Sequence, residues 1–165
     1  MIHKKIKSLD ELAHICEKLR AKNKIIIHCH GTFDLLHPGH INLFEQARSL
    51  GDIVIVTVTP DIHVRKGPGR PVYKEEIRVK SIAALIYVDF VSLDRNPEAH
   101  EIIRLLKPHI YVKSEEFAGK EKDPSLPMGR EKKTLDEVGA RLHFAKEILP
   151  FHSSHIIKNY FTNNN

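Results

Sequence analysis

The sequence predicts an α/β fold in which about five parallel strands form one sheet and helices cover both of its faces. Short apolar runs alternate with segments of helical periodicity along the chain. The run at 52–59 is almost continuously apolar, as expected for a strand that is buried on both faces. No linker or internal repeat interrupts the alternation, so the 165 residues are expected to form a single domain, 1–165.

The first half predicts a helix followed by a β-α-β unit. Ser8 and Glu11 have the spacing of a capping box, and apolar residues recur on one face of a helix at 8–21. The chain then continues with a strand, a helix that is closed by Gly51, and a buried strand, at residues 24–30, 38–50 and 52–59. Two parallel strands joined by a right-handed crossover follow from this order.

The alternation continues through the second half. After a Gly/Pro-rich loop at 66–71, the pattern predicts a helix, a strand, a helix and a strand at residues 74–86, 89–93, 97–106 and 110–113. Residues 115–130 are polar and predict a surface loop. The last elements are a helix at 131–138, a strand at 141–145, a helix at 153–161 and a disordered tail at 162–165. A Rossmann-like sheet of this kind has its ligand crevice at the carboxyl ends of the strands.

Composition narrows the class of protein. The net charge of +5 is spread along the chain between acidic residues, and charge alone does not separate nucleic-acid binding from a site for phosphorylated small molecules. Of the two we expect the phosphate site and no nucleic-acid partner. No apolar run approaches the roughly 20 residues that span a bilayer, so no membrane partner is expected. With two cysteines and no apolar signal segment at the start, we expect a cytoplasmic location.

The segment from Gly31 to His40 carries the clearest chemical pattern. It reads Gly-Thr-Phe-Asp-Leu-Leu-His-Pro-Gly-His and lies where the first predicted strand ends and the next helix begins. A glycine there lets the backbone approach a phosphate, and Pro38 suits the first turn of a helix whose amino end attracts anions. His37 and His40 can point to the same side and donate hydrogen bonds to a phosphorus centre as charge builds up on it.

Two other interpretations of this histidine pair stay open at this point. Histidines with this spacing also suit zinc, which needs further ligands. His28, Cys29 and His30 are near, but alternate residues of a strand face opposite ways, and we predict no dedicated metal site. The other interpretation is a purely structural role for both histidines.

The ten residues from Gly31 to His40 resemble the His-x-Gly-His signature of the cytidylyltransferase-like nucleotidyltransferases. The similarity covers roughly residues 24–160, and its further positions are Asp61, Lys66, Arg70-Pro71, Glu76 to Arg78, Ala83 to Leu85, Lys113 and His152 to Ser154. Order and spacing are most similar to the heptose-1-phosphate adenylyltransferase branch. The resemblance implies an enzyme that moves a nucleoside monophosphate from ATP or CTP to a small phosphorylated substrate, most like a sugar 1-phosphate, and releases pyrophosphate.

The same resemblance implies roles for individual residues. His37 and His40 would be the catalytic pair, and Lys66 would close over the reacting phosphates. Arg70 and Arg78 would shape the substrate side, with structural roles as the equal alternative. The residues expected to bind the nucleotide are Gly31, Thr32, Phe33, Asp34, Lys113, His152, Ser153 and Ser154.

Some of these assignments carry alternatives. Asp34 would help orient the site or touch the water shell of a metal, or it would simply cap the helix. Ser153 or Ser154 would grip phosphates, cap the last helix, or do both. Ser114 and Glu115 replace two glycines that follow the lysine of the family's Val-Lys-Gly-Gly segment, and His30 stands where close relatives usually carry a small polar residue.

The resemblance also implies the ligands. Mg²⁺ would be bound mainly through the triphosphate, and the partners would be a nucleoside triphosphate and a small phosphorylated substrate. Small relatives often form dimers, so a homodimer is a further expectation. The alternatives are a CTP-dependent transferase for a polyol or amino-alcohol phosphate and a non-catalytic nucleotide-binding module.

Overall fold

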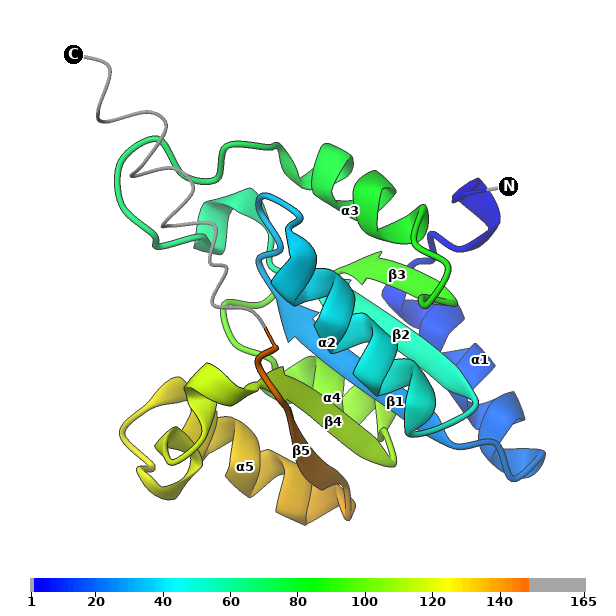
Figure 1. The fold of residues 1–165 in the computed structure, drawn as a ribbon. Coiled ribbons are helices and arrows are strands. Elements are labelled where there is room, and N and C mark those ends of the chain that lie inside the picture. The colour runs from blue at the N-terminus through cyan, green and yellow to red at the C-terminus, as the bar shows by residue number, and fades with distance from the viewer. Residues whose placement is uncertain (1, 149–165) are drawn as a thin grey trace.

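The computed structural model describes residues 2–148, and they contain a five-stranded sheet with the strand order β3-β2-β1-β4-β5 (Figure 1). Its strands are β1 (Ile26–Gly31), β2 (Ile53–Val58), β3 (Phe90–Leu93), β4 (Ile110–Ser114) and β5 (Arg141–Ala145). Every neighbouring pair is parallel, which confirms the predicted fold class. The chain reverses its direction across the sheet between β3 and β4, so the carboxyl ends of β1 and β4 flank the switch point where ligands bind in such folds.

Helices cover both faces of this sheet (Figure 1). They are α1 (Leu9–Ala21), α2 (Pro38–Ser49), α3 (Glu75–Ala83), α4 (His100–Leu106) and α5 (Pro127–Val138). Phe44 of α2 and Ile82 of α3 are buried with β1 and β2 in one core layer. Leu12 of α1, Ile103 of α4 and Leu135 of α5 are buried in the layer on the opposite face. The central strands are packed between these two apolar layers, which position the strand ends that carry the site.

The helix boundaries follow local signals in the sequence. Ser8 caps α1, and its hydroxyl and the Glu11 carboxylate each accept the other residue's backbone N–H, which confirms the capping box. α2 ends at Ser49, just before Gly51.

Helix α5 begins at Pro127, so the prediction of a loop to residue 130 was wrong at its end. Proline suits the first helical turn. Residue 129 of this helix is a glycine because an added Cβ would approach the Asp123 carbonyl oxygen to 1.9 Å. The remaining loop contains two 3-10 turns, Glu115–Phe117 and Lys120–Lys122. The predicted helix at 153–161 and the tail at 162–165 lie outside the described residues.

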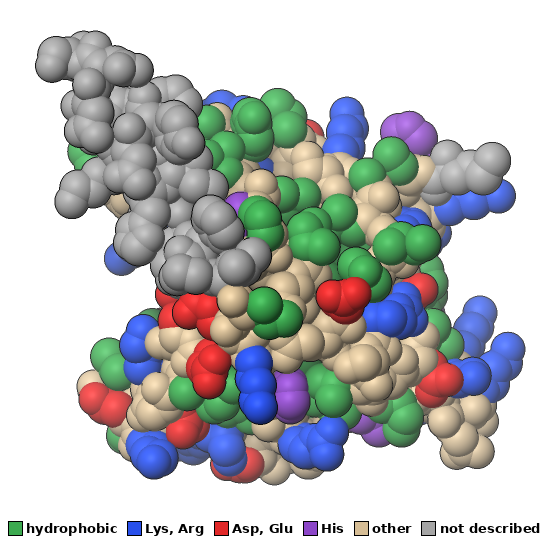
Figure 2. Space-filling view, in the orientation of Figure 1, with side chains coloured by type: hydrophobic (Ala, Val, Ile, Leu, Met, Phe, Trp, Pro, Cys, Tyr) green, Lys and Arg blue, Asp and Glu red, His purple; other side chains and the backbone are tan. Residues whose placement is uncertain are grey.

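The surface is mixed in charge. In the view of Figure 2, Lys and Arg side chains are interspersed with Asp and Glu over the lower half of the molecule, and hydrophobic side chains gather over α2 and α3. Within residues 2–148, no helix is both long enough and apolar enough to cross a membrane. Cys16 and Cys29 are both buried free thiols.

Candidate active site

A cavity of about 530 Å³ opens where β1 and β4 end. Seven of the residues predicted from the sequence line it: Gly31, Thr32, Phe33, His37, His40, Lys66 and Lys113. They come from the end of β1, the start of α2, the loop after β2 and the end of β4. The fold therefore gathers side chains that are up to 82 positions apart in sequence, from Gly31 to Lys113, at the predicted edge of the sheet.

His37 and His40 lie together at the amino end of α2. Their ring centroids are 3.8 Å apart and the rings are tilted by 30°. His37 is the N-cap of the helix, and its Nδ1 accepts the backbone N–H of Gly39 at 3.2 Å. Because Nδ1 is an acceptor, the ring hydrogen of neutral His37 is on Nε2. Nε2–H is therefore a donor that the helix holds in place.

The backbone amides in the first turn of α2 are already engaged. Pro38 has no N–H, the N–H of Gly39 is bound by His37, and the N–H of His40 donates to the His37 carbonyl at 2.9 Å. An anion at this helix end would thus interact with the imidazoles and the helix dipole more than with these amides. The histidine side chains carry the anion-binding capacity of this turn.

Phe33 supports the histidine pair from below. Its ring lies edge-on to His40, with centroids 5.3 Å apart, and contacts Phe44 at 5.1 Å. The backbone of Phe33 has φ of 47°, which is strained for a residue with a side chain. Gly31 accommodates the ring, because an added Cβ would lie 3.1 Å from it. This turn is shaped to hold Phe33 under the pair.

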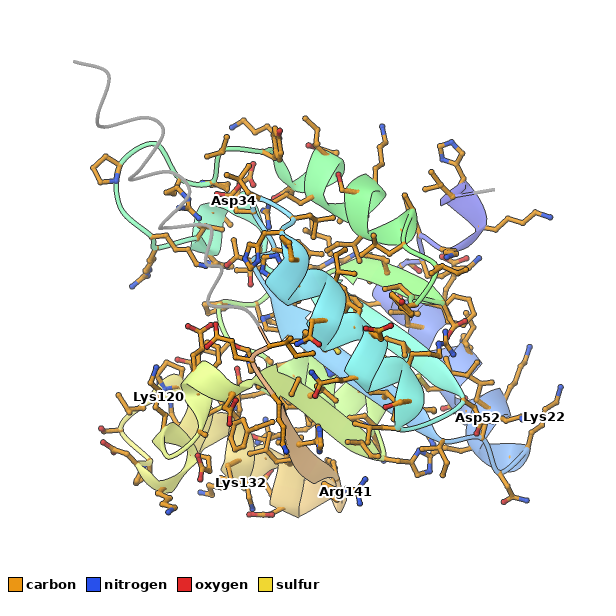
Figure 3. All side chains as sticks on the ribbon, in the orientation of Figure 1. Lys22, Asp34, Asp52, Lys120, Lys132 and Arg141 are labelled. Carbon is orange, nitrogen blue, oxygen red and sulfur yellow. The ribbon has the colours of Figure 1, made fainter. Side chains whose placement is uncertain are left out.

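Asp34 anchors the loop that carries Lys66. It is buried, accepts Nε of Arg70 at 2.7 Å, and accepts the backbone N–H groups of Val72 and Tyr73 at 2.9 and 3.0 Å. Figure 3 shows Asp34 in the loop between β1 and α2, next to the segment that leads to α3. Its helix-capping alternative was wrong, because His37 is the cap. The carboxylate orients the site by fixing this loop.

Arg78 is a structural cross-link in the same region. Its side chain is fully buried and donates to the Tyr73 carbonyl at 3.0 Å, the Thr32 carbonyl at 2.5 Å and the Asp61 carboxylate at 2.7 Å. Neither Arg78 nor Arg70 lines the cavity. These positions favour the structural alternative for both residues: all three guanidinium nitrogens of Arg78 hold loops together, and Nε of Arg70 binds Asp34.

Lys66 lies at the cavity, on the exposed loop between Asp61 and Arg70. The surrounding protein, and then the guanidinium of Arg70, lower the pKa of its ammonium. A bound anion would stabilise the charged form of this ammonium and so offset the lowering of its pKa. The position suits a cation that meets phosphates.

Lys113 also reaches the cavity, but it is not an isolated charge. Its Nζ lies 3.2 Å from the carboxylate of Glu131 and 3.4 Å from the His30 carbonyl. Tyr111 donates its hydroxyl to the same Glu131 carboxylate at 3.0 Å. Ser114, in place of the family's first glycine, has ordinary extended backbone, so this departure creates no strain. Sequence reasoning missed Glu131, because no spacing rule connects α5 to β4.

His30 and Thr59 are two further cavity residues at the ends of β1 and β2. Sequence reasoning considered His30 as a possible zinc ligand and as a departure from the family, and it missed Thr59, which ends a predicted strand and could have been found from that position. The other predicted nucleotide-binding residues, His152, Ser153 and Ser154, lie outside the described residues.

The donor set does not form a metal cage. Among residues 2–148, no group of three His, Cys, Asp or Glu side chains is placed to hold an ion. His28 and His30 lie on one face of β1 beside Thr57, whereas Cys29 is buried in the opposite core layer. The zinc interpretation therefore has no support in this part of the chain.

Known proteins share sequence similarity with this chain. A model of the cytidylyltransferase-like family covers residues 28–160. The bifunctional protein HldE of Desulfatibacillum aliphaticivorans is 41% identical over 156 residues, an alignment that covers 93% of this chain and 30% of that protein. HldE of Campylobacter jejuni subsp. doylei is 41% identical over 119 residues, covering 71% of this chain and 25% of that protein. The chain spans less than a third of the length of these relatives.

Two solved structures share the fold. A lipopolysaccharide core biosynthesis protein from Thermoplasma volcanium has a TM-score of 0.59 at 24% identity, covering 74% of this chain and 95% of that one. Pantoate-beta-alanine ligase from Francisella tularensis has a TM-score of 0.61 at 14% identity, covering 88% of this chain and 68% of that one. At these identities the likeness concerns the fold alone.

Proposed function

Because the chain belongs to the cytidylyltransferase-like family and is a nucleotidyltransferase, we propose that it transfers AMP from ATP to the phosphate of a sugar 1-phosphate, most like heptose 1-phosphate, and releases pyrophosphate. The resemblance of residues 24–160 to the heptose-1-phosphate adenylyltransferase branch supports the choice of ATP and of the acceptor. CTP with a polyol or amino-alcohol phosphate is the alternative, since those relatives share the histidine signature.

The observation that carries this proposal is the gathering of cationic and hydrogen-bond-donating groups around one cavity. His37, His40 and Lys66 line it together at the switch point of the sheet. A triphosphate and an acceptor phosphate together carry several negative charges, and such groups neutralise them where they meet. No protein side chain is needed as a nucleophile, because the acceptor phosphate supplies it.

The reaction follows from this arrangement. An oxygen of the acceptor phosphate attacks the α-phosphorus of ATP, the bond from that phosphorus to the bridging oxygen breaks in line, and pyrophosphate leaves with the electron pair. Nε2–H of His37, fixed by the Gly39 bond, donates to an oxygen whose charge grows in the transition state. His40 stacks on His37 and lies against the same centre. Lys66 balances the charge of the leaving pyrophosphate.

Mg²⁺ belongs to the proposal as a partner of the triphosphate. The described cavity wall offers the Glu116 and Glu147 carboxylates and no cluster of three acidic or imidazole ligands. This donor set fits an ion that keeps most of its waters and enters with the nucleotide. Bound there, the ion would supply neutralisation of triphosphate charge.

A homodimer and a cytoplasmic location complete the proposal. Several large hydrophobic side chains are exposed on and around α3, among them Tyr73, Ile77 and Ile86, and they support a second copy as a partner. Light scattering that gives the monomer mass at micromolar concentration would contradict this part. Two free buried thiols, Cys16 and Cys29, fit a reducing compartment.

Pyrophosphate release tests the proposed reaction. ATP and CTP, each with Mg²⁺, would be offered with heptose 1-phosphate, glycerol 3-phosphate, phosphocholine and phosphoethanolamine. We expect release with ATP and heptose 1-phosphate, abolished in H40A and unchanged in H14A, which removes an exposed histidine of α1. Release only with CTP would select the alternative. Release with no pair would contradict the proposal.

A further inference from the structure

A buried polar network lies beside the cavity and is separate from the His37–His40 pair. The Thr57 hydroxyl of β2 lies 2.8 Å from Nε2 of His28 and 2.9 Å from Nδ1 of His30, both on β1. Nε2 of His30 lies 3.3 Å from the Thr59 hydroxyl. His30 lines the cavity and keeps 6% of its side chain exposed, so it is the network's link to a ligand.

Asp94, which follows β3, has an unsatisfied oxygen aimed at this network. The residue is 0% exposed, and its Oδ1 accepts the backbone N–H groups of Arg95 and Asn96 at 2.7 and 3.1 Å. Its Oδ2 has no hydrogen-bond partner within the described part of the chain, and lies 3.8 Å from Nδ1 of His30. A buried carboxylate oxygen without a donor is costly, so the site is incomplete as it stands.

Counting hydrogens shows what would complete the site. Nδ1–H of His30 can be shared between the Thr57 hydroxyl and Asp94, which leaves Nε2 as an acceptor for the Thr59 hydroxyl. A proton added at Nε2 would turn that nitrogen into a donor. The Thr59 hydroxyl can rotate and accept, so protonation breaks no hydrogen bond and pairs Asp94 with a cation.

In the protein without ligand, the groups around His30 favour its neutral form. Burial, and then Lys113 and His28, lower the pKa of His30 well below its usual range. The charge of Lys113 is largely balanced by Glu131, which Tyr111 also contacts. Burial raises the pKa of Asp94, and the hydrogen bonds from Asn96 and Arg95, followed by the charge of His63, act on it in the opposite direction. These are the titratable groups that face the pair from β1, β4, α5 and the turn after β2.

We propose that His30 becomes an imidazolium when a phosphate-bearing ligand enters the cavity, with Asp94 as its buried counter-ion and with Nε2–H shared between the Thr59 hydroxyl and the phosphate. The inference rests on the proposed function, because it requires a phosphorylated ligand in this cavity. The proton comes from solvent, and the ligand's negative charge supplies the energy to hold it. The ligand chemistry is shared by the triphosphate and the acceptor phosphate.

NMR of protein labelled with ¹⁵N-histidine tests the charge of His30 directly, with H30N to assign its signals. Mg²⁺ with α,β-methylene ATP and heptose 1-phosphate would be added separately, at pH 7.5. We expect the neutral signature without ligand, and the signature of two protonated ring nitrogens with the ligand that contacts His30. The arm that produces the change identifies which phosphate is bound there.

Calorimetry supplies the second readout. Titrations of the same ligand in two buffers of different ionisation enthalpy should show uptake of about one proton by the wild type and none by H30N. H14N, the same substitution on an exposed face of α1, should behave as the wild type. D94N should keep His30 neutral and bind about tenfold more weakly at pH 6.5.

The outcomes separate the inference from the proposed function. If both ligands bind while His30 stays neutral, the inference is overturned and the proposed function stands. An imidazolium already present without ligand also overturns it. If neither ligand binds the folded wild type, both fail together. Should D94N not fold, H30N still decides between these outcomes.

Discussion

Replacing Asp34 with asparagine tests how the Lys66 loop is held. Both carboxylate oxygens of Asp34 accept hydrogen bonds, and the three donors are Nε of Arg70 and the N–H groups of Val72 and Tyr73. Asparagine keeps the shape but offers one acceptor oxygen, and its NH₂ would face a donor. The guanidinium of Arg70, 6% exposed, would lose its charged partner.

The expected cost follows from these contacts. Removing one member of a buried ion pair costs about 3–5 kcal/mol, and each stranded donor about 1–3 kcal/mol. The loop can detach and rehydrate its donors, which limits the loss of global stability to about 3 kcal/mol. Because Lys66 would detach with the loop, kcat should fall about 100-fold while the nucleotide KM changes less.

Three measurements on D34N would check this reasoning. Urea unfolding gives the change in stability, pyrophosphate release gives kcat and KM, and limited trypsin digestion reports cleavage after Arg65 or Lys66. D10N, the same change at an exposed position of α1, should resemble the wild type in all three. Wild-type turnover with a protected loop in folded D34N would refute the anchoring role.

Four other predictions follow from the same structure. H37N should retain the helix cap but lower kcat about 100- to 1,000-fold, and a folded H37N with full turnover would remove His37 from catalysis. The pKa of Lys66 is lowered, so activity should begin to fall at a lower alkaline pH than it would with an ordinary lysine. Because arginine keeps its charge, K66R should remain active to higher pH than the wild type, and an unchanged alkaline limit in K66R would contradict this. Burial lowers the pKa of His28 from 6.5 to about 3. The free energy of unfolding therefore has its full value above pH 6.5 and decreases as pH falls towards 3, because the unfolded chain takes up the proton first. Urea unfolding should show about 2–3 kcal/mol less stability from this group at about pH 4.5, and an equal dependence of stability on pH in H28Q would contradict this. G129A should lower the thermal midpoint strongly, because its Cβ would overlap the Asp123 carbonyl, and an unchanged midpoint would show that this approach is looser than described.

The sequence predicted the fold because its signals are local. Capping at Ser8, the almost continuous apolar run of β2 and the strand–helix alternation each act within a few residues, and all five parallel strands were placed within about two residues of their observed bounds. The start of α5 was missed because Gly129 looks like a helix breaker in the sequence, whereas its real constraint is the close approach of Asp123.

The site was predicted only in part, because its remaining features depend on distant contacts. His37, His40 and Lys66 were found from a continuous motif and a loop resemblance, and the fold brings them to one cavity. For Arg78 the sequence left a substrate contact and a structural role as equal alternatives, because charge type does not reveal burial and its three partners come from separate segments. The pairing of Lys113 with Glu131 depends on how α5 packs beside β4 and β5.

Identification of the reaction product tests the central claim most directly. The wild type would be incubated with Mg²⁺, heptose 1-phosphate and ATP carrying an ¹⁸O label on its α-phosphoryl group, and the products analysed by mass spectrometry. The account predicts one labelled ADP-heptose for each pyrophosphate formed, with the product lost in H37N and H40A. Formation of ADP with a sugar bisphosphate, or pyrophosphate without a sugar nucleotide, would contradict it.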